Sequence, residues 1–205
     1  MIQSRSVHLV DDDEAVRDSL AALLATHDFD VSAYPSGGAF LSACPTSAVG
    51  CLVTDVRMPD MDGLTLQERV VAAYPGLSVI IMTGHADVPL AVRAMKAGAI
   101  DFIEKPFPAP VIVDAIERAL GESARQRGPV PQPNAELRER LGSLTPRERD
   151  VLDGLVAGLP NKTIAYDLGI SPRTVEIHRA RVMEKMRAKS LSELVRIALQ
   201  LGIGT

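Results

Sequence analysis

Six polar residues in the first part of the chain have the side chains needed to bind a metal ion and a phosphoryl group. Three aspartates, Asp11–Asp13, follow the apolar run SVHLV, and Asp55 follows CLVT. Thr83 ends VIIMT, and Lys105 follows IDFIE. Carboxylates that pack together repel one another unless a cation lies among them, and Mg²⁺ prefers oxygen ligands. Lys105 and Thr83 can then bind phosphoryl oxygens, while Asp55 can act as a nucleophile and become an acyl phosphate.

The segments that carry these residues alternate between strand and helix patterns. Strands are predicted at 6–10, 31–34, 51–54, 79–83 and 100–104, and helices at 14–27, 38–43, 64–74, 90–98 and 109–120. Continuous Val, Ile and Leu runs are typical of parallel strands that are covered on both faces. We therefore predict an α/β doubly wound five-stranded parallel sheet. Such folds bind ligands beyond the carboxyl ends of their strands, where these polar residues would meet.

A single aspartate after a strand is more often a turn or helix-cap residue, and we expect that role for Asp13 and Asp62. The pattern D-x-x-x-P is also weak by itself. Four polar motifs at four strand ends, however, favour a functional site over coincidence.

The motifs VDDDE, TDVRMPDMDG, MTGHADVPLA and DFIEKPF resemble the receiver domain of two-component response regulators, over residues 5–121. The resemblance implies a flavodoxin-like sheet of order 2-1-3-4-5. It implies Asp55 as the phosphoacceptor and places Mg²⁺ on Asp12 and Asp55, with Asp11 bound through water and the backbone carbonyl of Arg57 completing the set.

The same resemblance assigns three further roles. Thr83 would be the switch hydroxyl, and Phe102 would be the aromatic that turns inward on activation. Lys105 would contact the phosphoryl group, and its bond to Pro106 is expected to be cis.

The charge of the chain is divided unequally. Residues 1–122 hold 17 acids and 8 bases, a net of −9, and residues 123–205 hold 9 acids and 14 bases, a net of +5. The proline-rich GPVPQPN lies near the change. We predict domains at 1–121 and 141–205 with a linker at 122–140, which can be helical at its flanks. A basic second domain indicates nucleic acid as its partner.

From Leu144 onward the pattern predicts a small all-α domain of four helices, two of them joined by a tight turn at Gly169–Ser171. Ser171 can cap the second of these helices and Pro172 suits its first position. Val175, Val182 and Met186 would face the core. The opposite, basic face is either simply solvated or bound to DNA, and Ile177 on it can contact a thymine methyl or pack on a neighbouring helix.

The segment LTPRERDVLDGLVAGLPNKTIAYDLGISPRTVEIHRARVMEKM resembles the LuxR-type helix-turn-helix domain, and the combination with this receiver is most similar to FixJ-type regulators. The resemblance implies DNA contacts along the two helices. The candidates are Lys162, Arg173, Thr174, Glu176, Ile177, His178, Ala180, Arg181 and Lys185. Many relatives have Lys in place of Glu176, so their operator sequences cannot be transferred.

We therefore expect a phosphorylation-dependent transcriptional regulator. A sensor histidine kinase would phosphorylate Asp55, and two receivers would pair through the surface of the fourth helix, fifth strand and fifth helix, near Arg93, Lys96 and Asp101. Promoter DNA is the expected partner, and RNA polymerase a further possible one. The receiver would phosphorylate itself and dephosphorylate slowly, without being an enzyme in the ordinary sense. The unphosphorylated receiver either blocks the DNA-binding domain or only supplies a dimer surface once phosphorylated.

The alternative is a Mg²⁺-dependent phosphohydrolase that uses Asp55 as a turnover nucleophile, with a helical domain that binds protein. Composition excludes other classes. Aromatic residues make up 3 % of the chain with no Trp, so stacking platforms for single-stranded nucleic acid are lacking. No apolar run is long enough for a membrane span. Two cysteines give neither a disulfide framework nor a zinc site, which leads us to expect a cytoplasmic protein.

Overall fold

The structure is a computed structural model, and it describes residues 5–85, 87–125 and 135–204. The chain divides after residues 85, 96 and 129 into two compact units. The first unit consists of the segments up to 85 and from 97 to 129, and the second of 86–96 and the remainder. Helix α4 (Val88–Lys96) is grouped with the second unit. The predicted proline-rich segment 128–134 lies outside the described residues.

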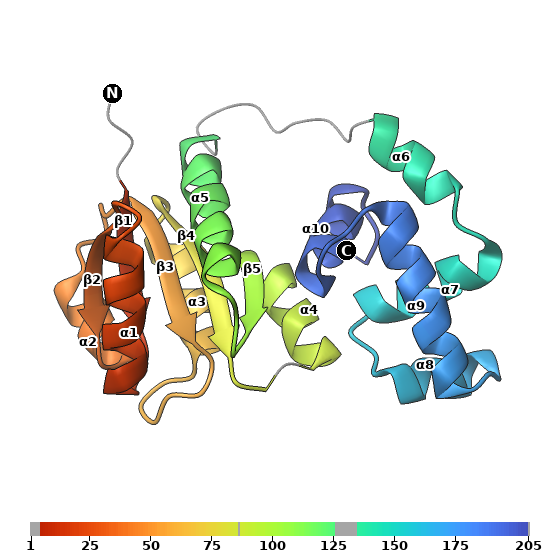
Figure 1. Cartoon of the computed structure of the whole chain (residues 1–205), viewed down its shortest axis with the longest axis horizontal. Helices are drawn as coiled ribbons and strands as arrows, with labels where there is room; N and C mark the ends of the chain where they lie inside the picture. Colours follow the sequence, from red (N-terminus) through yellow and green to blue (C-terminus); the bar gives the residue numbers. More distant parts are fainter. Residues whose placement is uncertain (1–4, 86, 126–134, 205) are drawn as a thin grey trace. The chain divides into compact units, whose positions relative to one another are not determined.

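Five parallel strands form one sheet within the described residues, in the order β2-β1-β3-β4-β5, as predicted. Figure 1 shows them with the helices that connect them. The strands are β1 (Ser6–Val10), β2 (Asp30–Tyr34), β3 (Gly50–Asp55), β4 (Leu77–Thr83) and β5 (Ala99–Glu104). Strands β3 and β4 are buried along their whole lengths, which explains their continuous apolar sequences.

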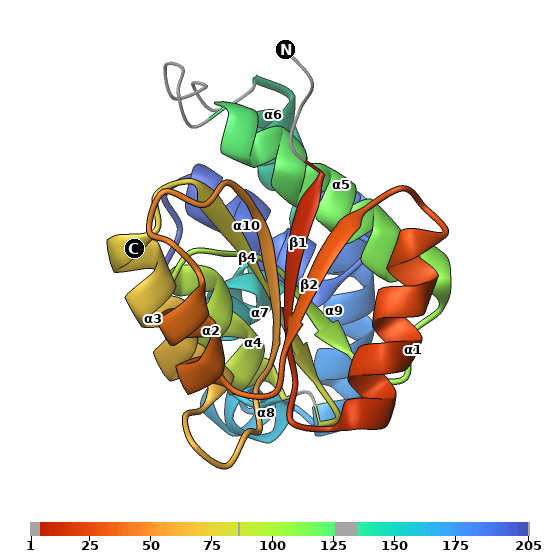
Figure 2. The ribbon, with the colours of Figure 1, turned by 90° about the vertical axis from the view of Figure 1, so that its left-hand side faces the viewer.

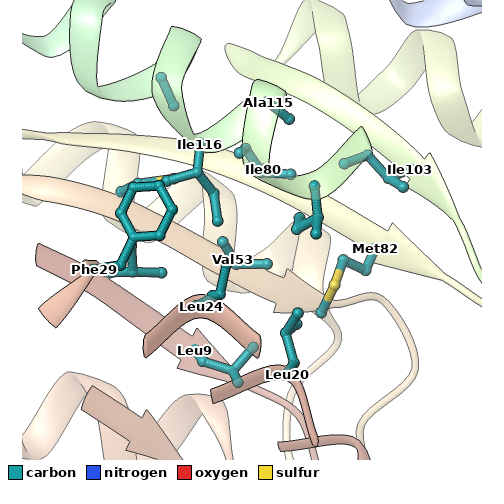
Figure 3. Packing of buried hydrophobic residues seen from close by; sticks show 14 of the residues in the cluster. Leu9, Leu20, Leu24, Phe29, Val53, Ile80, Met82, Ile103, Ala115 and Ile116 are labelled. Carbon is teal, nitrogen blue, oxygen red and sulfur yellow. The ribbon is translucent and has the colours of Figure 1, made fainter. Parts of the chain in front are cut away.

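Helices cover both faces of the sheet, with α1 (Glu14–Ala25) and α5 (Ala109–Arg125) on one side and α2 (Gly37–Ala43) and α3 (Gly63–Ala73) on the other, as Figure 2 shows. The core under α1 and α5 joins Leu24 and Ile116 to inward side chains of β1, β3 and β4, including Leu9, Val53 and Ile80 (Figure 3). This core orients the strands so that their carboxyl ends lie at one edge.

The second unit contains α6 (Ala135–Gly142), α7 (Pro146–Val156), α8 (Asn161–Leu168), α9 (Pro172–Met186) and α10 (Leu191–Gln200). The four predicted helices correspond to α7–α10, and α6 adds a helix within and just beyond the predicted linker. Leu137 and Leu141 of α6 pack against the same hydrophobic core as Leu152, Val175 and Leu194. The amphipathic sequence of α6 therefore contributes to the helical domain.

Candidate functional site

The carboxylates of Asp11 and Asp55 meet at the ammonium group of Lys105. Lys105 Nζ lies 2.6 Å from Asp11 Oδ2 and 2.6 Å from Asp55 Oδ1. Asp11 follows β1, Asp55 ends β3 and Lys105 follows β5, so three strand ends bring together residues that are far apart in the sequence. Both carboxylates are buried, at 2 % and 7 % exposure. The predicted convergence of these three side chains is confirmed.

Backbone groups orient the same two carboxylates. Asp13 N–H donates to Asp11 Oδ1 at 3.0 Å, and Arg57 N–H donates to Asp55 Oδ2 at 2.6 Å. The Arg17 guanidinium donates to the Asp11 carbonyl at 2.7 Å. Each carboxylate thus has one oxygen held by the main chain and the other by the lysine, which fixes the direction in which it points.

Opposing effects act on the pKa of Lys105. Burial by itself lowers this pKa, but the hydrogen bonds and negative charges of Asp11 and Asp55 outweigh burial and raise it above its ordinary value. The ammonium therefore remains charged at neutral pH and keeps the two buried carboxylates paired.

The remaining aspartates of this region divide between a ligand candidate and helix caps. Asp12 is exposed beside Asp11. Asp13 caps α1 by accepting from Ala15 N–H at 2.9 Å, and Asp62 caps α3 by accepting from Thr65 N–H at 2.7 Å. The capping roles expected for Asp13 and Asp62 are confirmed.

The donor set at this edge consists of oxygens. No group of three His, Cys, Asp or Glu side chains is arranged to hold a metal ion in the described part of the chain. Two buried carboxylates held by a single ammonium nevertheless form the kind of oxygen site that a hard cation uses, since such a cation takes its other ligands from carbonyls and water.

Thr83 ends β4, the strand next to Asp55, and Phe102 lies on β5, one strand further along the sheet. Thr83 is 1 % exposed, and its hydroxyl donates to the His85 carbonyl and accepts from the His85 N–H, both at 3.2 Å. The main chain of Lys105 donates to the Thr83 carbonyl at 2.7 Å, which joins β4 to the start of the loop after β5. Phe102 is already turned inward, with 8 % exposure. The Lys105–Pro106 bond is cis, as predicted.

On the surface predicted for pairing, Asp101 forms an ion pair with Arg118 of α5. Asp101 is 8 % exposed, so its carboxylate is largely covered in the single chain. Arg93 and Lys96 lie in the last turn of α4.

In the second unit, α8 and α9 are joined by a tight turn. Gly169 adopts φ 65° and ψ 34° at the end of α8, a left-handed conformation that glycine adopts at little cost. Ser171 caps α9, with its hydroxyl accepting from Thr174 N–H at 3.1 Å, and Pro172 takes the first helical position. Val175, Val182 and Met186 are fully buried, which confirms the predicted inner face of α9.

The opposite face of α9 is open to solvent. Its exposed residues include Arg173, Glu176, Ile177, Ala180, Arg181 and Glu184, with Thr174, His178 and Lys185 partly exposed, and Lys162 of α8 is exposed as well. Ile177 is 48 % exposed and lies outside the hydrophobic core. Of the two alternatives for Ile177, the structure therefore favours a residue that is available to a partner.

Lys185 has partners within the domain. Its ammonium lies 2.6 Å from Glu148 Oε2 and donates to the Ser143 carbonyl at 3.1 Å. Glu148 is 2 % exposed and also accepts from Thr145 N–H at 2.8 Å, which completes a capping box on α7. This pair between a partly exposed ammonium and a buried carboxylate joins α7 to α9, and it was not predicted from the sequence. The pattern Thr145-x-x-Glu148 is the signal that could have assigned Glu148 to the cap.

A second contact that was not predicted from the sequence lies at the end of α9. Arg140 of α6 donates to the Met186 carbonyl at 3.3 Å and pairs with Glu136 at 2.6 Å. The guanidinium therefore satisfies one of the open carbonyls that every helix end leaves.

Comparison with known proteins identifies both units. The response regulator receiver domain family matches residues 7–117, and the LuxR family of bacterial regulatory proteins matches residues 142–198. The chain therefore belongs to the response regulators that join a receiver domain to a LuxR-type DNA-binding domain. It regulates transcription in a phosphorylation-dependent manner, and it is not an enzyme in the ordinary sense.

The similar curated proteins include transcriptional regulatory proteins named FixJ. The FixJ of Azorhizobium caulinodans is 54% identical over 99% of this chain and 96% of its own length, and that of Rhizobium meliloti is 54% identical over 97% of both. Among solved structures, full-length FixJ from B. japonicum has a TM-score of 0.54 at 47% identity, with 96% of this chain and 97% of that one covered. This chain is thus a FixJ-like regulator. In its described part, no helix is long and apolar enough to cross a bilayer.

Proposed function

We propose that a sensor histidine kinase transfers its phosphoryl group to Asp55. The observation that carries this proposal is the meeting of Asp11, Asp55 and Lys105 at three strand ends. In the transfer, an oxygen of the Asp55 carboxylate attacks phosphorus, the bond from phosphorus to the kinase imidazole breaks, and the imidazole nitrogen leaves with the bonding electron pair. The receiver can catalyse the same transfer from a small acyl phosphate, and slow attack of water on the acyl phosphate returns free Asp55.

Mg²⁺ is the cofactor that we propose for this site. Asp12 and Asp55 would bind it, with the backbone carbonyl of Arg57 and, through water, Asp11. When bound, it neutralises charge that develops on the transferred phosphoryl group. Lys105 needs only to exchange its hydrogen bond with an Asp55 oxygen for one with a phosphoryl oxygen, because its ammonium already lies against that carboxylate.

We further propose that the phosphoryl group draws the Thr83 hydroxyl away from the His85 carbonyl. A phosphoryl oxygen is a stronger, charged acceptor than the carbonyl that this hydroxyl now contacts at 3.2 Å. Movement of the segment after β4 would alter the α4–β5–α5 surface near Arg93, Lys96 and Asp101, through which two receivers would pair. Phe102 is already buried, so its contribution would be a change of packing within the core rather than a movement from solvent.

A receiver pair would place two α9 helices on a two-fold promoter site. Glu176, Ile177 and Ala180 are the proposed base-facing residues, with Lys162, Arg173, Thr174, His178, Arg181 and Lys185 toward the DNA backbone. Lys185 would have to contact DNA while it stays paired with Glu148, and its side chain is 34% exposed, which leaves room for both contacts. Promoter DNA implies a cytoplasmic location, and RNA polymerase is a further proposed partner.

The test is a DNase footprint with and without acetyl phosphate and Mg²⁺, on a duplex enriched from a random-sequence pool by the wild-type protein. Asp55→Asn is expected to abolish labelling by radioactive acetyl phosphate, because an amide cannot form the acyl phosphate. It is also expected to abolish the increases in dimerisation and in footprint strength that follow phosphorylation. Asp62→Asn is the matched control, since Asp62 only caps α3 and asparagine caps equally well. A footprint that strengthens equally in Asp55→Asn contradicts the proposal, and rapid repeated turnover of acetyl phosphate would favour the phosphohydrolase.

A further inference from the structure

The most exposed large hydrophobic side chain in the described part of the protein lies on α8. Tyr166 is 87% exposed, compared with 48% for Ile177 and 49% for Val71. Single exposed aliphatic residues are common on protein surfaces. An aromatic ring that stands almost entirely in solvent on the first helix of a helix-turn-helix is a feature that the assigned DNA contacts do not explain.

Packing on the opposite side of α8 holds Tyr166 in this exposed position. Ile164 and Ala165 are 2% exposed and belong to the domain core, so rotation of the helix that buried Tyr166 would expose both. The left-handed Gly169 and the bond from Ile170 N–H to the Ala165 carbonyl, at 3.0 Å, then end the helix at a defined angle. The exposure of Tyr166 is therefore built into the domain.

The surroundings of Tyr166 on α8 are polar and include a cation. Lys162 lies four residues earlier, which places it on the same helix face, and both residues are exposed. Thr163 and Asp167 are the other exposed residues of this helix. The carboxylate of Asp167 lies one position around the helix, about 100° from Tyr166, so it need not face the same ligand atom.

We propose that Tyr166 donates its phenolic O–H to a phosphate of the DNA backbone and, beside Lys162, positions α9 in the major groove. In a helix-turn-helix the first helix crosses the backbone while the second enters the groove, and tyrosine is among the side chains that bind phosphate oxygens. The exposed Lys162 on the same face of α8 is complementary to a phosphate, and the short turn at Gly169 places this helix directly before α9, so DNA is the occupant that we assign to this face. The proposal rests on DNA binding by this domain and adds one contact to it.

A neutral phosphate contact has a signature that distinguishes it from a cationic one. Each Lys or Arg that neutralises a phosphate steepens the dependence of log affinity on log salt by about 0.9, because a counterion is released. A phenol releases none. Loss of the Tyr166 hydroxyl is therefore expected to lower affinity by the same factor at every salt concentration, whereas loss of the Lys162 charge makes the salt dependence shallower.

The experiment uses the full-length protein, phosphorylated with acetyl phosphate and Mg²⁺, and two duplexes of roughly 30 base pairs, enough for two half-sites one turn apart. One duplex is that enriched by the wild-type protein from a random pool, and the other has a mixed sequence. Affinities are measured by fluorescence anisotropy from about 50 to 200 mM salt. Binding by the wild-type protein tests the DNA-binding function itself, and the variants test only Tyr166.

Three variants are compared with the wild type. Tyr166→Phe is expected to bind both duplexes about five-fold more weakly per bound protomer, the usual size for one neutral hydrogen bond, with an unchanged salt slope. Lys162→Gln is expected to reduce the salt slope by about 0.9 per protomer. Tyr166→Arg is expected to bind more tightly than Tyr166→Phe and to increase the salt slope by about 0.9 per protomer. None should change the melting temperature, because both positions are exposed.

Each contrary result overturns the proposal. Tyr166→Phe with wild-type affinity on both duplexes would show that the hydroxyl contacts no DNA, and if transcription fell at the same time, a protein would be the partner. A loss confined to the enriched duplex would indicate a base contact in place of a phosphate. An unchanged slope in Tyr166→Arg would show that position 166 does not lie beside the backbone.

Discussion

The pair between Glu148 and Lys185 gives a prediction that can be worked through in free energy. Hydrogen bonds from Lys185 and from the Thr145 N–H lower the pKa of Glu148 from 4.5 to about 2. At about 1.4 kcal/mol per unit of pKa, this difference corresponds to an upper bound of about 3.5 kcal/mol in stability at neutral pH. Lys185 is 34% exposed, so solvent screens part of the interaction. We therefore expect the pair to contribute about 2 kcal/mol to the unfolding free energy at neutral pH.

The perturbation is Glu148→Gln, which keeps the shape of the side chain and an oxygen for the Thr145 cap but removes the charge. At neutral pH the variant is expected to lose about 2 kcal/mol of unfolding free energy in the helical domain, because a charge-assisted bond is worth roughly 1.5–3 kcal/mol. The exposed carboxylate of Glu136, which pairs with Arg140, supplies the control, since Glu136→Gln should lower the unfolding free energy much less than Glu148→Gln.

The dependence on pH follows from the direction of the shift. Because the folded pKa of Glu148 is depressed, its contribution is present above the ordinary value of 4.5 and is lost as pH falls through about 2. The wild type and Glu148→Gln should therefore converge in stability between these values. Urea unfolding followed by circular dichroism at several pH values measures the difference, and hydrogen exchange in α7 and α9 assigns it to this domain. A difference below about 0.5 kcal/mol at neutral pH, the size of an exposed pair, would refute the reasoning.

Two further predictions concern the phosphoacceptor site. A Cβ at Gly63 would lie 2.1 Å from the Asp55 carbonyl oxygen, so Gly63→Ala must displace the backbone of the phosphoacceptor. We expect a loss of about 1–3 kcal/mol in stability and strongly reduced labelling by acetyl phosphate. In contrast, a Cβ at Gly121 would meet no described atom within 4 Å apart from its chain neighbours and its own helix backbone, so Gly121→Ala should behave as the wild type in both assays. Lys105→Met is expected to slow labelling about 10²-fold, because it removes the cation that stabilises the transferred phosphoryl group. Calorimetric titration should show that Mg²⁺ binding survives in this variant, and equal losses of metal binding and labelling would contradict that division of roles.

The sheet was predictable because its signal is local. Continuous apolar runs such as VIIMT are buried at every position of β4, so the pattern read from the sequence is the pattern that the fold uses. The order of the strands came from the resemblance to receivers. Boundaries were less accurate: β4 begins at Leu77, two residues before the predicted start, and α5 extends to Arg125, past the predicted domain end.

The candidate site was predictable to the same extent as the strand ends. Once β1, β3 and β5 run parallel in one sheet, their carboxyl ends lie at the same edge, which brings Asp11, Asp55 and Lys105 toward one another. Their distances and the backbone donors that orient them depend on the loops, for which the sequence carries no periodic signal. The caps at Asp13 and Asp62 were recognised because capping depends on residues within one turn.

The contacts that were missed join segments whose packing no local pattern reports. In the sequence, Lys185 is one of several bases on a basic helix, yet its ammonium binds Glu148, 37 residues earlier in the chain. Arg140 lies in the predicted linker, yet its guanidinium binds the last turn of α9. Both side chains are long and charged, and such side chains can face either water or a buried partner.

The sequence alone therefore determined the class of each domain, the chemical types of the site residues and the inner face of α9, because all of these depend on periodicity and on residue identity. Only the tertiary structure decided which charges pair, which oxygen of each carboxylate is held, and that Tyr166 stands in solvent while its neighbours Ile164 and Ala165 are buried. The physical reason is distance. Electrostatic and hydrogen-bonding partners are set by separations of a few ångströms in space, and those separations exist only after the helices and strands have packed.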